Sequence, residues 1–348
     1  MLADQLDYVI GVDTHKDVHA LAVVSAPTGG VVCEAALPAS AAGYREALRL
    51  AQAAGAGRRA FAIEGTGSYG AGLARFLASR GERVLEVGRL PREGRRSRAK
   101  TDSLDAIRAA RSVLAQERVA QPRAGGRREE LRALVVCREG ALAAKRAGLC
   151  QLRDLLLCAP PTLREQLQTL SRARLLRRLA QLRLEQRKET AARGSLLALR
   201  LLARRLQALT LEERQLAREI KALVEQSAPQ LLAEPGVGPV CAARVLLSFS
   251  HRGRIHSEAA FARLAGAAPI PASSGRTIRH RLDPGGDRQL NRALHTIVLS
   301  RRKSHPPTIA YLQRRTRQGK TTREATRCLK RYLARHLYRM LEKTATAA

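Results

Sequence analysis

Aromatic side chains are scarce in this chain of 348 residues. It contains no tryptophan, four phenylalanines and six tyrosines, so that aromatic residues make up 3% of the sequence. Proteins that hold single-stranded nucleic acid without sequence preference stack its bases on such side chains. The scarcity therefore argues against stacking as the main way in which this chain would hold a single strand.

Paired cysteines, a signal peptide and a long uninterrupted apolar run are also lacking. There is no C-x-x-C pair and no histidine at zinc-finger spacing, so the cysteines are interpreted as small buried apolar residues in a reducing compartment. The scattered positions are Cys33, Cys137, Cys150, Cys158, Cys241 and Cys328. These absences predict a cytoplasmic protein without a membrane partner.

Acidic residues are outnumbered, because 63 Lys and Arg stand against 30 Asp and Glu and the net charge is +33. Such a surplus makes nucleic acid the expected partner and predicts an association with the nucleoid, since phosphate neutralisation supplies most non-specific affinity. The surplus is uneven: residues 1–120 hold 17 basic and 13 acidic residues, and residues 121–348 hold 46 and 17. The front third is expected to be catalytic and the remainder to bind the polyanion.

Against this basic background, four carboxylates stand in three short motifs. They are Asp13 in GVDTHK, Glu64 in AIEGTGSYG, and Asp102 with Asp105 in KTDSLDA. Magnesium prefers oxygen ligands, and two such ions can activate an attacking oxygen and stabilise a leaving one in phosphodiester chemistry. We predict that these four acids bind Mg²⁺. His15 is interpreted as a polar residue at a strand end, with proton transfer as the alternative role.

The first third alternates strands and helices in a mixed α/β order. Short β-branched runs predict strands at 8–12, 19–24, 31–35, 59–64 and 83–87, with helices at about 42–53 and after Gly70. Asp102 and Asp105 lie at i and i+3 on the next predicted helix and so share one face. Acids on a first strand, a fourth strand and a late helix converge only in certain folds, of which the ribonuclease-H-like fold is one.

The middle of the chain is predicted to be helical from about residue 127 to 224. Breaks are expected at Pro160-Pro161 and, more weakly, near Gly194. A heptad seam, interrupted at Glu213, favours a coiled coil that joins subunits, and two helices packed within one chain are the alternative. The seam consists of Leu202, Leu206, Leu209, Leu216, Ile220 and Leu223.

A tight turn at Gly236-Val237-Gly238 follows, between two helical stretches within residues 231–249. This order resembles a helix-hairpin-helix element, in which backbone N–H groups bind a phosphate. Gly236 and Gly238 are therefore candidate nucleic-acid contacts. A helical hairpin that only turns the chain is the alternative.

Two further segments combine arginines with residues of possible chemistry. In residues 265–295, Ser273 and Ser274 precede Gly275, and from the residues alone a plain turn is the more common outcome. Arginine forks nearby match phosphate oxygens, and charge also precedes Asp102. The predicted nucleic-acid contacts of the two segments are Arg276, Arg279, Arg281, Arg288, Arg95, Arg96, Arg98 and Lys100.

Taken together, the motifs resemble those of the DEDD transposases of the insertion-sequence one-ten (IS110) family. The likeness runs in order and spacing from about Tyr8 to Leu341. The segments that carry it are GVDTHK, AIEGTGSYG, KTDSLDA, LLAEPGVGPVCAARVL, APIPASSG with GGDRQLNRALH after it, and GKTTREATRCLKRYLARHLY.

The resemblance implies a fold and a set of site residues. The expected parts are an N-terminal α/β RuvC-like domain of ribonuclease-H fold (1–120), a long helical coiled-coil region (121–228) and a mainly α C-terminal transposase domain (229–348). The family's acidic tetrad falls on Asp13, Glu64, Asp102 and Asp105, and its serine nucleophile on Ser274. Ser273 stands where a different polar residue is common in the family.

The resemblance also implies an activity. The protein would be a transposase or site-specific DNA recombinase of an insertion sequence, guided by a structured non-coding bridge RNA that pairs with donor and target DNA. Ser274 would form a phosphoserine link to DNA, and homo-oligomers, dimers or tetramers, would form through the coiled coil. Two alternatives are a structure-selective nuclease, a junction resolvase in which the tetrad alone cuts, and a nucleic-acid-binding protein without chemistry.

Overall fold

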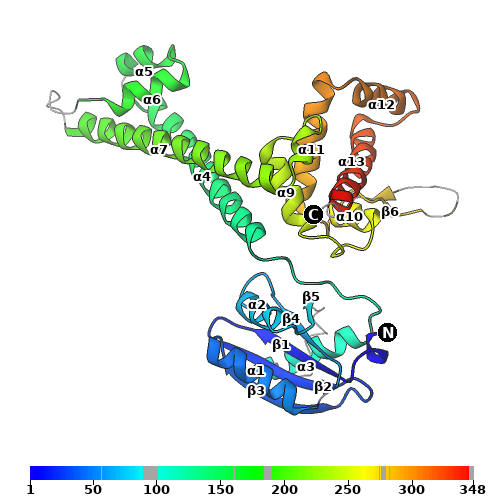
Figure 1. The fold of residues 1–348 in the computed structure, drawn as a ribbon. Coiled ribbons are helices and arrows are strands. Elements are labelled where there is room, and N and C mark those ends of the chain that lie inside the picture. The colour runs from blue at the N-terminus through cyan, green and yellow to red at the C-terminus, as the bar shows by residue number, and fades with distance from the viewer. Residues whose placement is uncertain are drawn as a thin grey trace. The chain divides into compact units, whose positions relative to one another are not determined.

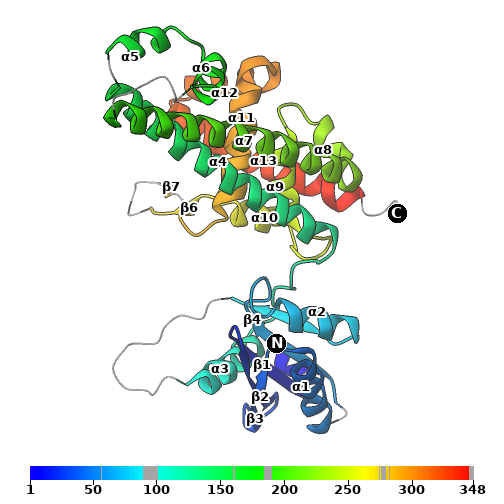
Figure 2. The same cartoon turned by 90° about the vertical axis from the view of Figure 1, so that its left-hand side faces the viewer.

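A computed structural model describes residues 1–55, 57–88, 101–159, 161–183, 190–273, 275, 280–281 and 283–344 (Figures 1 and 2). The chain separates into two compact units. The α/β unit comprises residues 1–125 with 250–256, and the helical unit comprises residues 126–249 with 257–348. An α/β start followed by a mostly helical remainder was predicted and is confirmed.

The α/β unit is built on one mixed sheet of five strands in the order β3-β2-β1-β4-β5. Strands β1, β2 and β3 pair antiparallel, whereas β4 and β5 run parallel to β1. The elements are η1 (Leu2–Asp4), β1 (Tyr8–Thr14), β2 (Val18–Ser25), β3 (Val31–Pro38), α1 (Ala41–Ala53), β4 (Arg59–Glu64), α2 (Ala71–Ser79), β5 (Val84–Val87) and α3 (Asp102–Leu114). All five predicted strands are present.

Helices cover both faces of this sheet (Figure 2). Because side chains alternate along a strand, Ile10 and Val12 pack in one apolar cluster with residues of α1 and α2. Val9 on the same strand packs in the other cluster, with Ala109 and Ala110 of α3. Gly11 and Asp13, which alternate along β1 in step with Val9, therefore lie on the face of the sheet that α3 covers.

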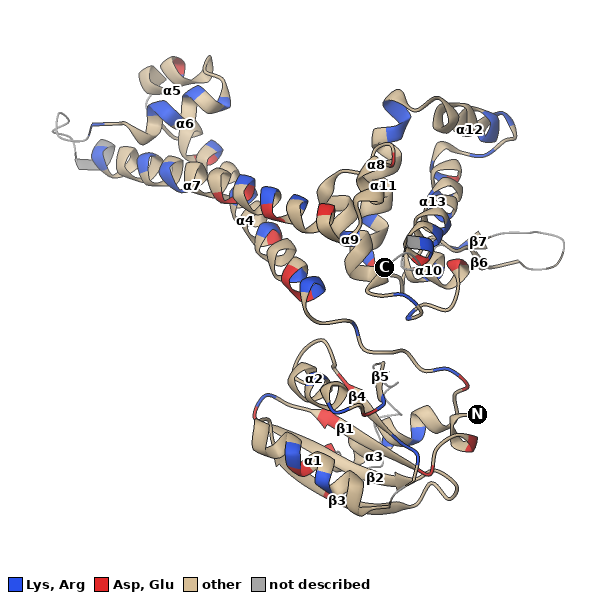
Figure 3. Cartoon of the chain, viewed as in Figure 1, with Lys and Arg blue, Asp and Glu red and all other residues tan. Residues whose placement is uncertain are grey.

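The helical unit contains two long helices, α4 and α7, that lie side by side (Figures 1 and 2). Lys and Arg recur along its helices (Figure 3). Its elements are α4 (Arg127–Leu157), α5 (Pro161–Gln168), α6 (Arg172–Ala180), α7 (Thr190–Ser227), α8 (Pro229–Ala233), α9 (Pro239–Phe249), α10 (Glu258–Leu264), β6 (Ile270–Pro271), β7 (His280–Arg281), α11 (Arg288–Ser304), α12 (Pro306–Arg317) and α13 (Thr322–Thr344).

Helix α4 ends close to the predicted break at Pro160-Pro161, of which Pro160 lies outside the described residues. The predicted break near Gly194 was wrong, because Gly194 lies inside α7. A lone glycine weakens a helix by only about 1 kcal/mol, which the packing of a long amphipathic helix outweighs. Among the described helices, none is both long and apolar enough to cross a membrane.

The heptad seam of α7 is partly covered by the chain's own helices. Leu202 and Leu206 are buried in a cluster that includes Leu152 of α4. At the interruption, Glu213 accepts hydrogen bonds from Lys145 at 2.8 Å and from Arg138 at 3.2 Å, both on α4. Packing within one chain thus accounts for this part of the seam, and a coiled coil between subunits stays a prediction.

The helices after α7 pack around a separate core. Phe249 of α9, Phe261 of α10 and Tyr338 of α13 have ring centroids 5.9–6.3 Å apart. Arg335 of α13 also donates to Glu258 at the start of α10. These contacts join the two sides of the segment that carries the serines, which runs from β6 to the start of α11.

Candidate functional site

Asp13 and Glu64 stand at neighbouring strand ends. The register of the parallel pair places Val12 opposite Ile63, so the next residues along the two strands are Asp13 and Glu64. The Thr14 hydroxyl donates to the Glu64 carbonyl over 2.8 Å, which ties the two ends together. Side chains alternate between faces, so both carboxylates belong to the face that α3 covers.

A glycine sets how closely α3 approaches that face. A Cβ atom placed on Gly11 would lie 1.9 Å from the backbone oxygen of Ala106 and 2.8 Å from the backbone nitrogen of Ala110. The helix backbone therefore rests directly on β1, two residues before Asp13. Any side chain at position 11 would push α3, and the acids at its start, away from the sheet.

The other two acids lie in the first turn of α3. The helix begins at Asp102 after its N-cap, Thr101, whose hydroxyl accepts from the Leu104 N–H at 3.4 Å. Negative side chains are favoured at a helix N-terminus, where the backbone N–H groups point outward. Asp105 pairs with Arg108 at 3.1 Å. The predicted placement of Asp102 and Asp105 on one helix is thus observed.

Additional bonds fix the position of α3 at both ends. Ser103 donates to the Glu34 carboxylate of β3, and Arg111 donates to the Gly29 carbonyl at 3.0 Å. The stripe formed by Ala106, Ala109 and Ala110 is buried on the sheet. Small side chains there allow the close approach that Gly11 requires. The carboxylates of Asp102 and Asp105 precede this stripe by less than two turns, which brings them to the end of β1.

Asp13, His15 and Asp102 form a group whose ligand atoms all lie within 4.8 Å of one another. His15 Nε2 lies 3.2 Å from an Asp13 oxygen and 3.5 Å from an Asp102 oxygen. Burial raises the pKa of the Asp13 carboxyl, and repulsion from Asp105 and Asp102 adds to this, against the opposing effect of His15. A partly buried carboxylate and an exposed one that repel each other are a donor set that a divalent cation stabilises. The residues therefore fit such an ion.

Glu64 and Asp105 are not part of this three-residue group. Glu64 lies beside Asp13 by strand register, and Asp105 is near enough to act on the charge of Asp13. Among the described residues, Asp13 and Asp102 are thus the two predicted carboxylates within common ligand distance. Glu64 ends the strand that pairs with β1, and Asp105 lies in the first turn of α3. Their predicted roles as metal ligands stay predictions.

His15 was interpreted as a plain strand-end residue, and the structure places it between two of the acids. Its alternation with Asp13, two positions earlier, was the available signal, because residues i and i+2 of an extended segment share a side. His19 behaves differently. It is buried and stacks on Tyr44 of α1 with ring centroids 5.9 Å apart. It therefore lies on the face of the sheet that α1 covers, opposite to the face of the acids.

The serine segment lies in the helical unit between two short paired strands. Ile270 and Pro271 of β6 pair with Arg281 and His280 of β7, a hairpin that the sequence did not predict. Ser273 is exposed, and Gly275 has a positive φ of 55°. Ser274, Arg276 and Arg279 lie outside the described residues. Arg281 and Arg288 are exposed.

Hydrogen bonds and close backbone packing hold the two ends of this segment. Asp287 caps α11 by accepting from the N–H groups of Gln289 (2.9 Å) and Leu290 (3.0 Å). Its second oxygen accepts from the Ser248 hydroxyl at 2.8 Å. A Cβ on Gly286 would lie 2.3 Å from the nitrogen of Gly266, so the backbones before and after the hairpin touch. The hairpin therefore starts and ends on a fixed platform.

Buried Lys330 reaches the same platform from α13. Its ammonium donates to Asn291 at 2.6 Å, and Asn291 donates to the Ala265 carbonyl at 2.6 Å. Burial lowers the pKa of Lys330, and the charge of Arg327 adds to this. This buried cation was not predictable from the sequence, because a lysine in a basic helix is usually solvated.

The Gly-Val-Gly turn connects the five-residue helix α8 to α9. Gly236 has a φ of 75°, which favours glycine, and Gly238 is exposed at the start of α9. The preceding Glu234 accepts from Arg301 at 2.8 Å and lies 2.7 Å from His336. The turn is thus held by α11 and α13. Its predicted phosphate contact stays a prediction, and Arg95, Arg96, Arg98 and Lys100 lie outside the described residues.

Comparisons with known proteins point to one family. A model of DEDD transposases of IS110 elements matches residues 10–161, and the model of the Transposase IS116/IS110/IS902 family matches residues 228–313. A curated relative, the insertion element IS110 uncharacterized 43.6 kDa protein of Streptomyces coelicolor, is 34% identical over 143 residues. The match covers 40% of this chain and 35% of that relative, so it spans about a third of the relative's length.

Proposed function

This chain belongs to the IS110 family of transposases, and on that premise we propose that it cuts and rejoins the DNA of an insertion element. The observation that carries the proposal is the meeting of Asp13 and Asp102 at the end of β1, with Glu64 on the next strand. In a chain with a net charge of +33, such a group of acids has a chemical role rather than a solubilising one.

The chain's own carboxylates would hold the cation and leave room for the scissile phosphate. Bound there, Mg²⁺ supplies positive charge that neutralises the phosphate and favours the attacking oxygen. Asp13 and Asp102 would be the main ligands, because their oxygens lie within 4.8 Å of each other, and Glu64 and Asp105 would act as further ligands beside them. His15 orients the Asp13 carboxylate through a hydrogen bond of 3.2 Å, and the same ring nitrogen lies 3.5 Å from the Asp102 carboxylate.

Ser274 is the proposed nucleophile. Its hydroxyl oxygen bonds to the phosphorus of a DNA phosphodiester while the bond to one deoxyribose oxygen breaks, and the proton of the serine passes to the departing oxygen. Attack by a hydroxyl of the other DNA end restores a phosphodiester and the serine hydroxyl, so no external energy is needed. Support comes from the resemblance of the APIPASSG segment and from the platform under the hairpin.

The matched test uses the two adjacent serines. Incubation of the protein with donor DNA and Mg²⁺, followed by denaturing electrophoresis, is expected to show a protein–DNA adduct that Ser274→Ala removes and Ser273→Ala retains. An adduct lost only in Ser273→Ala would move the nucleophile by one residue. Magnesium-dependent cleavage unaffected by both substitutions would contradict the phosphoserine step and favour a resolvase.

Guidance by a structured non-coding RNA is the second part of the proposal. It is supported by the family resemblance and by the 46 basic residues after residue 120, which exceed the acids there by 29. Purification without nuclease treatment is expected to yield one discrete RNA with the protein. A heterogeneous mixture of cellular RNA would instead indicate charge-driven binding and contradict guidance.

Assembly into dimers or tetramers is the third part, because the acids lie between 169 and 261 residues before Ser274 in the sequence. We infer that one subunit's acids serve another's serine. Mixing Ser274→Ala protein with Asp13→Ala protein tests this, since each inactive variant keeps the half that the other lacks. Recovered strand exchange supports shared sites, and no recovery with both variants folded counts against them.

A further inference from the structure

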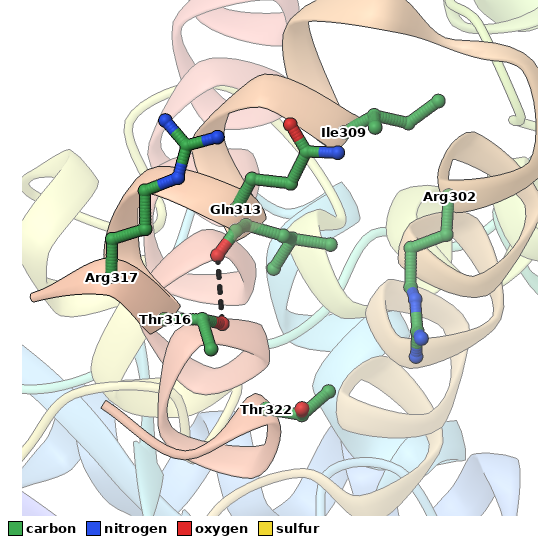
Figure 4. A pocket seen from close by; sticks show the side chains of 7 residues that line it. Arg302, Ile309, Gln313, Thr316, Arg317 and Thr322 are labelled. Atoms are coloured by element: carbon green, nitrogen blue, oxygen red, sulfur yellow. Dashed lines mark hydrogen bonds between the residues drawn. The ribbon is translucent and has the colours of Figure 1, made fainter. Parts of the chain in front are cut away.

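A pocket of about 550 Å³ lies between α11, α12 and α13 of the helical unit, and none of the residues proposed for the chemistry lines it. Figure 4 shows Arg302 and Arg317 on opposite sides of it, with Gln313 between them. Its lining residues are Arg302, Ile309, Leu312, Gln313, Thr316, Arg317 and Thr322. The pocket thus combines two guanidinium groups, an apolar floor and several neutral polar groups.

The two pocket arginines differ from their neighbours on the same helices. Arg301 pairs with Glu234 at 2.8 Å, Arg315 donates to Gln318 at 2.8 Å, and Arg314 lies over the Tyr311 ring at 5.5 Å. In the part of the chain that the structure describes, neither Arg302 nor Arg317 has a hydrogen bond, an ion pair or a ring contact of the kind that these neighbours have. Their charges are therefore available to an anion from outside.

Uncompensated positive charge is general in these helices. Residues 288–344 contain 16 Lys and Arg but only two acids, Glu324 and Glu342. Glu324 is already used at the start of α13, where it accepts from Thr321. Burial lowers the pKa of His295, and the charges of Lys330 and Arg302 lower it further. The electrostatic potential of the region is thus positive, which favours the binding of anions.

We propose that this pocket binds the sugar–phosphate backbone of a nucleic acid strand, with Arg302 and Arg317 contacting its phosphates. Planar guanidinium forks match phosphate oxygens. Ile309 and Leu312 provide an apolar floor for the sugars, and Gln313 and Thr322 add neutral hydrogen-bonding groups. The floor favours a nucleic acid over an acidic peptide, whose carboxylates carry no comparable apolar ring. The inference rests on the proposed function only in that both require nucleic acid.

The test measures binding rather than reaction, so it stands even if strand exchange is never observed. The double variant Arg302→Gln/Arg317→Gln of the full chain is titrated with single-stranded DNA and with RNA of equal length, in chelator and at several salt concentrations. Affinity is expected to fall about tenfold, and the slope of log K against log salt should become shallower by about 1.4, which is 0.7 for each of two lost phosphate contacts.

The matched control is Arg314→Gln, which removes a charge from the same helix but not from the pocket. It is expected to change affinity much less, and equal loss would overturn the pocket in favour of diffuse charge. A second variant, Arg302→Lys/Arg317→Lys, keeps the charge and loses the forks, so it should retain the salt slope and bind more weakly. Circular dichroism melts confirm that each variant folds.

Further outcomes identify the strand or reject the proposal. An effect confined to DNA assigns the pocket to donor or target DNA, and one confined to RNA assigns it to the guide. Unchanged slope and affinity for both strands in the folded double variant would overturn the proposal. So would tighter binding of a poly-glutamate peptide than of either oligonucleotide, if the double variant abolished it.

Discussion

The α/β unit gathers acids at one point, whereas the helical unit spreads cations along its helices. Carboxylates repel one another, so Asp13 and Asp102 meet only because strand register, the bare backbone of Gly11 and the cap of α3 hold them there. Basic side chains that contact successive phosphates of a polyanion do not have to converge on one point. They need only a helix with an exposed face for the cations and an opposite apolar face that is buried, as on α11 and α13. Single changes should therefore be severe in the first unit and graded in the second.

The largest effect is expected from removal of one carboxylate. Asp13→Asn keeps the shape of the side chain and removes the charge, so metal binding by titration of Mg²⁺ should weaken sharply. Strand cleavage should fall by more than about 100-fold, because even loss of groups around metal ligands costs roughly 10- to 100-fold. Nucleic-acid binding in chelator should change little, since the substitution removes no basic side chain.

Asp17→Asn provides the control, because Asp17 is an exposed acid four residues after Asp13 and directly after the GVDTHK motif. It should leave both metal binding and cleavage intact. Equal loss in the two variants would mean that general negative charge, rather than the group around Asp13, is required.

The second largest effect concerns the approach of α3. Gly11→Ala places a Cβ against the backbone of Ala106, and overpacking of this kind costs about 3 kcal/mol. We expect a lower free energy of unfolding in urea and weaker metal binding, because the helix that carries Asp102 must shift.

The helical unit offers a glycine that should respond in the opposite direction. Gly140 is exposed within α4, and a Cβ there meets nothing within 4 Å. Gly140→Ala should therefore stabilise the protein by about 0.5 to 1 kcal/mol. If Gly11→Ala were equally harmless, the close packing of α3 on β1 would be contradicted.

Much of the α/β unit could be predicted, because its signals are local. Apolar runs ending at Val12 and Ile63 marked two strands, and the acids directly after them marked one sheet edge. The part played by His15 was missed, since its spacing from Asp13 indicates only a shared side and says nothing about the second acid that approaches it. Its neighbour, Asp102, is 87 residues away and arrives only through the packing of α3.

The helical unit was harder to predict in detail. Periodicity located the long helices, yet it could not say whether the seam at Leu202 and Leu206 faced another subunit or the same chain. The β6–β7 hairpin and buried Lys330 also escaped, because both depend on contacts between distant segments. Arginine counts predicted a polyanion partner but not that Arg302 and Arg317 would line one pocket.

The smallest effect is expected at Glu213, where the heptad pattern is interrupted. If the seam joined subunits, Glu213→Leu would complete it and strengthen association. Packing within one chain predicts instead that Arg138 and Lys145 lose their partner, at a cost of about 1 to 2 kcal/mol. Urea unfolding and sedimentation of the variant distinguish the two, since only the first arrangement gives a larger oligomer.

The pH dependence gives an independent check of the same contact. The hydrogen bond from Lys145 holds the pKa of Glu213 below its ordinary value of 4.5, against a smaller effect of burial. The folded state therefore binds this proton less readily than the unfolded state does. The stabilisation is complete above about pH 4.5 and disappears as the pH falls through the lower folded pKa.

Wild type should exceed Glu213→Gln in free energy of unfolding at neutral pH, and the difference should shrink as the pH falls below 4.5. A difference that stays constant over this range would show that the ion pair with α4 contributes nothing, and would return the seam to a partner subunit.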